Sequence, residues 1–439
     1  MHSFAPEIML ITILSLVVLS DALASRLKIP SVFLLLTGSY LIYTYFKAAV
    51  PIDLTLHFDT IILFCIPLIF MGDALHLHFS DLKKHGWSIF YLAVVAVALS
   101  ITAGASLYYL DNVFTGLSLG AYVSLFAINM ATDAVSVQSV LSRFKGISHD
   151  IKVLIEGESL GNDATAVIAF FFIGLPWMVS GEIDPMHATT EALRVFAVSI
   201  GMGLALGYSF YMLMKLFSDK RGELFAFIIE GYAAYVLGEE MHVSGILTLI
   251  TAIIATKAWI DMDIAAACSL DAKKKKGFFA KLRLENICAT TNERLEYIYE
   301  MAKEFGYIAA VMIFFVLAEM VDLEKLWYYR NEILIMFGVT TVIRALSMAK
   351  FAFFGKTIDS IKPVGKEGWF ILTFSGMKGA LSIILVHMIP ANYEYKALFE
   401  SVTIGVVVLS IFVYGTTLWA YFTFFKKEKK VDLFVASKH

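Results

Sequence analysis

The sequence contains little charge and few cysteines. Only 17% of its 439 residues are Asp, Glu, Lys or Arg, whereas a soluble domain carries roughly 25%. The net charge of −3 provides no basic excess for binding nucleic acid, so we expect no nucleic-acid partner. The three cysteines, Cys65, Cys268 and Cys288, lack a paired spacing. This spacing argues against a disulfide or metal framework.

Recognisable enzyme signatures are also missing from the sequence. We find no cofactor motif, nucleophile elbow or cluster of metal ligands, so we expect no cofactor and no enzymatic activity. A structural scaffold is disfavoured by the buried charges described below. The first apolar block, residues 8–23, shows no convincing small-residue cleavage pattern, so we expect no cleaved signal peptide.

Apolar residues dominate instead, and they occur in long blocks. The chain is 59% hydrophobic with a mean hydropathy of +0.75. Blocks of about 20 residues match the roughly 30 Å of a membrane core and are too long for β-barrel strands. The sequence therefore predicts an all-α integral membrane protein. We expect about thirteen transmembrane helices, near residues 6–24, 31–47, 59–79, 87–109, 114–140, 152–178, 189–217, 222–238, 243–258, 297–320, 331–354, 368–390 and 398–425.

The connections between these spans alternate between Lys-rich and Lys-poor. The positive-inside rule places the Lys-rich set in the cytoplasm, which predicts an external N-terminus and a cytoplasmic C-terminus in the cell membrane. The longest polar connection, 259–296, contains the run Lys273–Lys276. This connection is either a solvated linker or a contact for anionic lipids.

Several polar residues lie deep within the apolar spans. Asp133 lies in span 5, while Glu158, Ser159, Asn162 and Asp163 lie in span 6. A charged residue at membrane depth costs at least ~2.5–3.5 kcal/mol, so it usually serves ion or proton transport. Residues four apart share a helix face, so span 6 presents side-chain oxygens in two adjacent columns. The competing interpretation is a polar cluster that holds helices together.

Spans 5 and 12 each contain a polar interruption. Span 5 reads Asn129-Met130-Ala131-Thr132-Asp133, and span 12 reads Ser375-Gly376-Met377-Lys378-Gly379. Such a pair, one in each half, indicates the broken helices of a transporter ion site. Unwinding at Thr132 would free backbone carbonyls as ligands. Lys378 would neutralise charge where helix ends meet, or alternatively extend its ammonium group to the membrane surface.

Arg344 and Asp73 complete the candidate residues. Arg344 lies inside span 11, where an unpaired arginine would be costly, and we expect Glu158 to be its partner. Asp73 ends span 3 and is a candidate to line an ion funnel. The nearby His76 and His78 are expected to be solvated rather than to bind a metal.

Several motifs together resemble the monovalent cation/proton antiporter superfamily, in its NhaP and eukaryotic sodium/proton exchanger branch. Their order and separation extend over nearly the whole chain, and the Gly-Glu-Ser-x-x-Asn-Asp string is the most specific. The motifs are Ala131-Thr132-Asp133, Gly157-Glu158-Ser159-Leu160-Gly161-Asn162-Asp163, Ser244-Gly245, Arg344-Ala345-Leu346, Gly376-Met377-Lys378-Gly379 and Tyr414-Gly415-Thr416-Thr417.

The resemblance implies an inverted-repeat fold in which spans 5 and 12 are crossed, discontinuous helices. It implies a moving core from residues 87–180 and 326–425. It also implies a dimerisation domain from residues 1–86 and 181–325, and hence a homodimer, with residues 426–439 as a short cytoplasmic tail.

The resemblance also implies roles for the buried residues. Asp133 and Asp163 would bind a cation and a proton in competition, with Ser159 and the Thr132 carbonyl as further Na⁺ ligands. Glu158 and Arg344 would pair and hold Asn162. Relatives with Asn-Asp at this position resemble electroneutral exchangers.

Two positions depart from the pattern of the superfamily. Ala134 stands where many relatives have proline, and Lys378 stands where many have arginine. Lysine, unlike arginine, is able to lose its proton when buried.

We therefore predict a secondary antiporter that exchanges Na⁺ for H⁺ across the membrane, with lipids around it. Li⁺ or K⁺ as the cation remains an alternative, because all three ions prefer oxygen ligands. A K⁺/H⁺ antiporter of the same superfamily or an uncoupled cation channel are the other functions considered, although no ring-forming filter motif is present in the sequence.

Overall fold

A computed structural model describes most of the chain. The described residues are 4–27, 29–50, 54, 57–77, 79–110, 113–114, 116–142, 144, 147–217, 219–270, 290–353 and 365–425. His78, the lysine run 273–276 and the tail 426–439 lie outside these ranges. Within the described ranges the chain is helical and contains no strand, which confirms the predicted all-α class.

The helices follow one another with short connections. Their bounds are α1 (Ala5–Leu27), α2 (Ser31–Tyr45), α3 (Phe58–His76), α4 (Phe79–Phe90), α5 (Ala96–Ala105), α6 (Leu119–Ile128), α7 (Ala134–Leu141), α8 (His149–Ala169), α9 (Leu175–Ser180), α10 (Pro185–Met214), α11 (Lys220–Glu240), α12 (Gly245–Leu270), α13 (Asn292–Met320), α14 (Leu323–Tyr328), α15 (Arg330–Phe353), α16 (Gly365–Phe374), α17 (Ala380–His387), α18 (Lys396–Leu409) and α19 (Gly415–Ala420). Wider π-helical turns join α4 to α5, α8 to α9 and α18 to α19.

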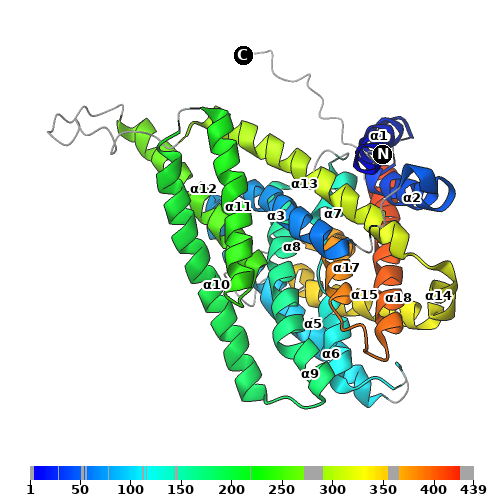
Figure 1. Ribbon diagram of the computed structural model, residues 1–439. Coiled ribbons are helices and arrows are strands. Elements are labelled where there is room, and N and C mark those ends of the chain that lie inside the picture. The colour runs from blue at the N-terminus through cyan, green and yellow to red at the C-terminus, as the bar shows by residue number, and fades with distance from the viewer. Residues whose placement is uncertain are drawn as a thin grey trace, which may run out of the picture.

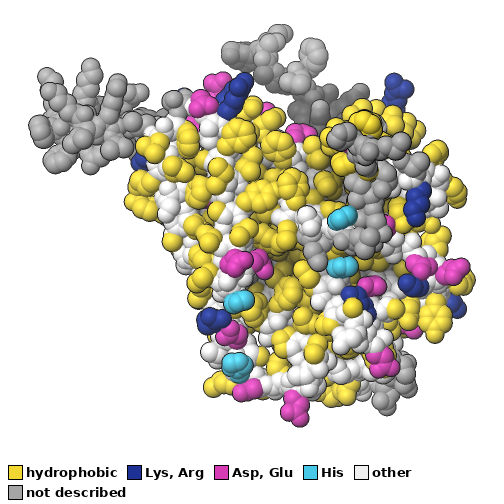
Figure 2. Space-filling model, viewed as in Figure 1, with side chains coloured by type: hydrophobic (Ala, Val, Ile, Leu, Met, Phe, Trp, Pro, Cys, Tyr) yellow, Lys and Arg dark blue, Asp and Glu magenta, His cyan; other side chains and the backbone are white. Residues whose placement is uncertain are grey.

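Eight helical stretches among the described residues are long and apolar enough to cross a membrane. Three shorter apolar helices, Ser31–Tyr45, Thr60–His76 and Leu119–Ile128, add to them. Hydrophobic side chains cover much of the face seen in Figure 2, as expected for a surface in contact with lipid. The prediction of a multi-pass membrane protein is thus confirmed, while the count of thirteen spans stays a prediction.

The predicted bounds of the polar connection, 259–296, are wrong. Helix α12 continues to Leu270 and α13 begins at Asn292, so both ends of the predicted connection are helical. One buried side chain and one ion pair stabilise the charged end of α12. Ile260 is fully buried, and the carboxylate of Asp263 lies 3.2 Å from the ammonium group of Lys215 on α10.

The long helices α10, α11 and α12 stand together on one side of the molecule (Figure 1). Gly203 and Gly207 of α10 face the backbone of α12, where an added Cβ would lie 2.7 Å from the carbonyl oxygens of Thr248 and Ala252 respectively. Small residues at this spacing let two membrane helices approach closely. Gly201, which belongs to the same sequence pattern, points into open space.

Two helices are interrupted where the sequence predicts it. Residues 129–133 separate α6 from α7, and residues 375–379 separate α16 from α17. The two interruptions contact each other, because the backbone N–H of Asp133 donates to the carbonyl of Met377 over 2.8 Å. Ser382 of α17 also donates to the carbonyl of Ile128 at the end of α6, over 2.8 Å. The four half-helices therefore meet inside the bundle.

Candidate functional site

The two columns of polar side chains on α8 line different cavities. Ser159 and Asp163 line a cavity of about 30 Å³. Glu158 and Asn162 line a second cavity of about 20 Å³. All four side chains are buried. The two adjacent columns predicted from the sequence thus face two separate environments on neighbouring sides of one helix.

Thr132, in the interruption of span 5, lies against both columns. Its backbone carbonyl accepts a hydrogen bond from Ser159 Oγ over 2.6 Å, and its hydroxyl accepts one from Asn162 Nδ2 over 2.8 Å. These two bonds fix the unwound segment against α8. They satisfy backbone and side-chain groups that would be costly to bury unpaired in the membrane.

The larger of the two small cavities is lined by acidic and hydroxyl side chains, although no three acidic side chains of the described residues lie close enough together to hold a metal ion as they stand. Three carboxylates line it, from Asp73 of α3, Asp133 of the interruption and Asp163 of α8, together with Ser159 and Thr132. Oδ1 of Asp163 is buried without a hydrogen-bond partner among the described residues. A water molecule needs roughly 10–15 Å³, so about 30 Å³ fits a cation that has lost most of its water shell.

Asp133 is held from several directions. It caps the N-terminus of α7, where its Oδ1 accepts from the backbone N–H of Val135 over 3.0 Å and its Oδ2 accepts from Ser136 Oγ. On another side, the backbone of Gly379 lies so close that an added Cβ would overlap the Asp133 side chain. Asp133 therefore joins the two interrupted helices.

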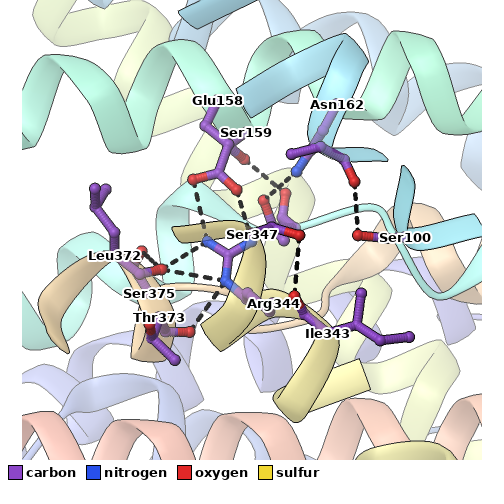
Figure 3. A network of polar contacts seen from close by, with 12 residues as sticks. Ser100, Glu158, Ser159, Asn162, Ile343, Arg344, Ser347, Leu372, Thr373 and Ser375 are labelled. Atoms are coloured by element: carbon purple, nitrogen blue, oxygen red, sulfur yellow. Dashed lines mark hydrogen bonds and ion pairs between the residues drawn. The ribbon is translucent and has the colours of Figure 1, made fainter. Parts of the chain in front are cut away.

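Arg344 of α15 pairs with Glu158 on the other side of α8 (Figure 3). The pair is bidentate, with Nη1 to Oε1 at 2.6 Å and Nη2 to Oε2 at 3.0 Å. Arg344 also donates to two backbone carbonyls at the end of α16, those of Leu372 and Thr373, at distances between 2.8 and 3.1 Å. One guanidinium group thus neutralises Glu158 and caps the half-helix that leads into the second interruption.

Lys378 lies in that second interruption. Its backbone N–H donates to Ser410 Oγ over 2.8 Å, and its side chain lines the second cavity with Glu158, Asn162 and Arg344. Only 4% of its surface is exposed, which excludes the alternative of an ammonium group that reaches the membrane surface.

Asp73 connects the small carboxylate cavity with a wider one. The same residue lines a cavity of about 280 Å³ that also contains Asp21, Glu304 and His76. His76 and Tyr299 in turn border a further cavity of about 380 Å³. The three cavities thus share polar lining residues, Asp73 between the first two and His76 with Tyr299 between the last two.

Some contacts at the site were not predicted. His76 is not simply solvated, because its Nδ1 lies 2.6 Å from Oε2 of Glu156. The other oxygen of Glu156, Oε1, accepts from Gln138 Nε2 over 3.2 Å. Ser136 was overlooked as well. Its signal is an Asp followed three residues later by a hydroxyl residue, a spacing that allows mutual contact at a helix start. No comparable pattern marks Glu156.

Comparison with known proteins agrees with this architecture. A sequence profile of the family described as "Sodium/hydrogen exchanger, transmembrane" matches residues 11–268. The low-affinity Na⁺/H⁺ antiporter NhaS1 of Synechocystis is 23% identical over 92% of this chain and 71% of its own length. The Na⁺/H⁺ antiporter NhaH of Halobacillus aidingensis is 25% identical over 95% of this chain and 96% of its own.

The likeness extends to a solved structure. The sodium proton antiporter MjNhaP1 from Methanocaldococcus jannaschii, determined at pH 8, superposes with a TM-score of 0.69. It covers 95% of this chain and 96% of its own, at 15% identity, and therefore supports the fold alone. Because the family profile covers more than half of the sequence, the chain belongs to the transmembrane sodium/hydrogen exchangers.

Proposed function

We propose that this protein exchanges Na⁺ for H⁺ across the cell membrane as an electroneutral antiporter. The observation that carries the proposal is the small cavity lined by Asp73, Asp133 and Asp163. The names of the related antiporters support the same choice of ions. Li⁺ and K⁺ have the same ligand preference, and a cation panel measured in the same assay separates the three.

Coupling follows from the cost of a buried negative charge. A carboxylate without a partner in a low-dielectric site is very costly, so an unpaired carboxylate of the cavity needs either a proton or a cation. We infer that Asp163, whose Oδ1 has no protein partner among the described residues, is where the two compete. Asp133, Ser159 and the Thr132 carbonyl then supply further oxygen ligands.

Charge balance argues for one cation against one proton. Glu158 is neutralised by Arg344, and it lines a different cavity from Asp163. If Asp133 keeps the same charge when either substrate is bound, the site moves one positive charge in each direction. Lys378 then serves as a nearby compensating charge.

Transport further requires that the site open to each side of the membrane in turn. We propose that residues 87–180 and 326–425 move as a core against residues 1–86 and 181–325, which also form a homodimer. The contact between His76 of α3 and Glu156 of α8 joins these two parts and would break during the movement. The expected orientation has the N-terminus outside and the C-terminus in the cytoplasm.

The decisive experiment uses purified protein in liposomes with a pH-sensing dye inside. Added Na⁺ should dissipate an imposed pH gradient in a saturable manner. Asp163→Asn should abolish this response while the protein still folds, because the variant lacks the carboxylate that both substrates need. Glu191→Gln, on the exposed surface of α10, should behave as wild type. Wild-type exchange by Asp163→Asn would refute the assignment, and a flux that follows voltage without proton coupling would favour a channel.

A further inference from the structure

We propose that Ser136 is a positioning residue that orients the Asp133 carboxylate for cation binding. This inference rests on the proposed function, because it assigns the support of one ligand in the same cavity. Ser136 itself is 1% exposed, does not line the cavity and acts through Asp133.

Contacts on Asp133 leave one direction open. The Ser136 hydroxyl donates to Oδ2, and the Val135 N–H donates to Oδ1 over 3.0 Å. Gly379 packs directly against the side chain. The remaining direction is the cavity that also contains Asp163 and Ser159. Of these contacts, the bond from Ser136 is the one made by a side-chain hydroxyl, so substitution removes it without altering the backbone.

The residue that follows Asp133 makes the bond from Ser136 more important. Ala134 is the first residue of α7, the position at which a proline ring would fix φ near −65° and pre-form the turn. Alanine imposes no such restriction on the segment that carries Asp133. We infer that the Ser136 bond supplies orientation that a proline at this position would provide through the backbone.

A hydrogen-bonded carboxylate remains able to bind a cation. Each carboxylate oxygen offers two lone-pair sites, so the bonds from the Val135 N–H and from the hydroxyl and N–H of Ser136 leave at least one site of Asp133 for a cation. Groups that hydrogen-bond to a metal-binding carboxylate fix its orientation, and their loss typically costs 10–100-fold in affinity. Ser136 therefore contributes to Na⁺ affinity without contacting Na⁺.

Other charged groups belong to the same cluster. Asp73 of α3 and Asp163 of α8 line the cavity with Asp133, and Lys378 of the second interruption acts on Asp163. Substitution of Ser136 leaves all three in place. Measurements at one alkaline pH, where protons compete least with Na⁺, compare the Na⁺ affinity of the variants at the same proton concentration.

The test compares Na⁺ dependence in four variants. Ser136→Ala should raise the KM for Na⁺ by about tenfold while the maximal exchange rate stays within about twofold of wild type. Ser136→Thr keeps the hydroxyl and should restore the wild-type KM. Ser136→Cys, a weaker donor of similar size, should fall between. Ser124→Ala removes a buried hydroxyl whose one hydrogen bond among the described residues is to the Gly120 carbonyl within α6, and it serves as the matched control.

A second measurement separates this inference from the proposed function. The rise of the melting temperature with Na⁺ concentration in detergent reports binding without turnover, because Na⁺ that binds only the folded protein stabilises it by RT ln(1 + [Na⁺]/Kd). The same ordering of the variants in the Kd fitted to this rise supports the role of Ser136 even if exchange itself is absent. An unchanged KM and an unchanged fitted Kd in Ser136→Ala, with wild-type exchange intact, would overturn the inference while leaving the proposed function standing. Equal effects in Ser136→Ala and Ser136→Thr would also overturn it.

Discussion

The ion pair between Arg344 and Glu158 allows a quantitative prediction. Their side chains are 13% and 3% exposed, respectively, so neither charge is well hydrated when its partner is removed. Breaking one side of a buried pair costs about 3–5 kcal/mol, because it leaves an uncompensated charge. We expect Arg344→Ala and Glu158→Ala each to lower the melting temperature of the purified protein strongly.

The two substitutions should not be equivalent. Arg344 also donates to the carbonyls of Leu372 and Thr373 at the end of α16, and a hydrogen bond to a charged group contributes about 1.5–3 kcal/mol. Glu158→Ala leaves these bonds in place, whereas Arg344→Ala removes them with the ion pair. Arg344→Ala should therefore be the more damaging change, and Arg344→Lys should recover only part of the loss because lysine lacks the planar fork.

The double variant tests whether the residues act as a pair. Removing both charges leaves neither uncompensated, so the combined effect should be smaller than the sum by about 1–3 kcal/mol, the coupling of contacting residues. The matched control is the exposed pair of Glu191 and Arg194 on α10, whose removal should change the melting temperature little and additively. Additive shifts for Arg344 and Glu158 would refute the reasoning, as would a greater loss in Glu158→Ala than in Arg344→Ala.

Two further predictions concern helix packing and stoichiometry. Gly203→Leu should destabilise the protein by about 1–3 kcal/mol in thermal melts, because its added Cβ would lie 2.7 Å from the Thr248 carbonyl, whereas Gly201→Leu, which faces open space, should have little effect. In liposomes at fixed pH and Na⁺ gradients, an imposed membrane potential should not change the exchange rate if transport is electroneutral. A moved elementary charge would contribute about 2.3 kcal/mol per 100 mV, so a clear voltage dependence would contradict the one-to-one assignment.

The sequence predicts the helices and both interruptions well, for a physical reason. A membrane requires long apolar helices, so exceptions to that pattern stand out at the residue level. The polar runs 129–133 and 375–379 are such exceptions, because an exposed backbone cannot persist in lipid unless protein groups satisfy it. The boundary of α12 was harder to predict, because its charged end is stabilised by the pairing of Asp263 with Lys215, a contact distant in sequence.

The site itself was predictable only in part. The residue types at Asp133 and Asp163 are informative because charge is rare at membrane depth. Which cavity each column of α8 faces depends on the placement of α15 and of the second interruption, which local sequence does not specify. The contact between His76 and Glu156 likewise depends on how α3 and α8 approach each other.

The separation of the two cavities bears on the proposed function, in which α8 both holds the fold together and supplies ion ligands. Glu158 pairs with the side chain of Arg344. The negative charge of Glu158 is therefore balanced as long as this ion pair persists. Asp163, five residues further along α8, faces a cavity with carboxylates, and its Oδ1 has no hydrogen-bond partner among the described residues. Under the proposed function, a mobile cation or proton supplies the balancing charge at Asp163, with Lys378 as a more distant positive charge. Because Thr132 bonds to Ser159 and to Asn162, one from each column, the proposed ion site and the ion pair hold the same interrupted segment.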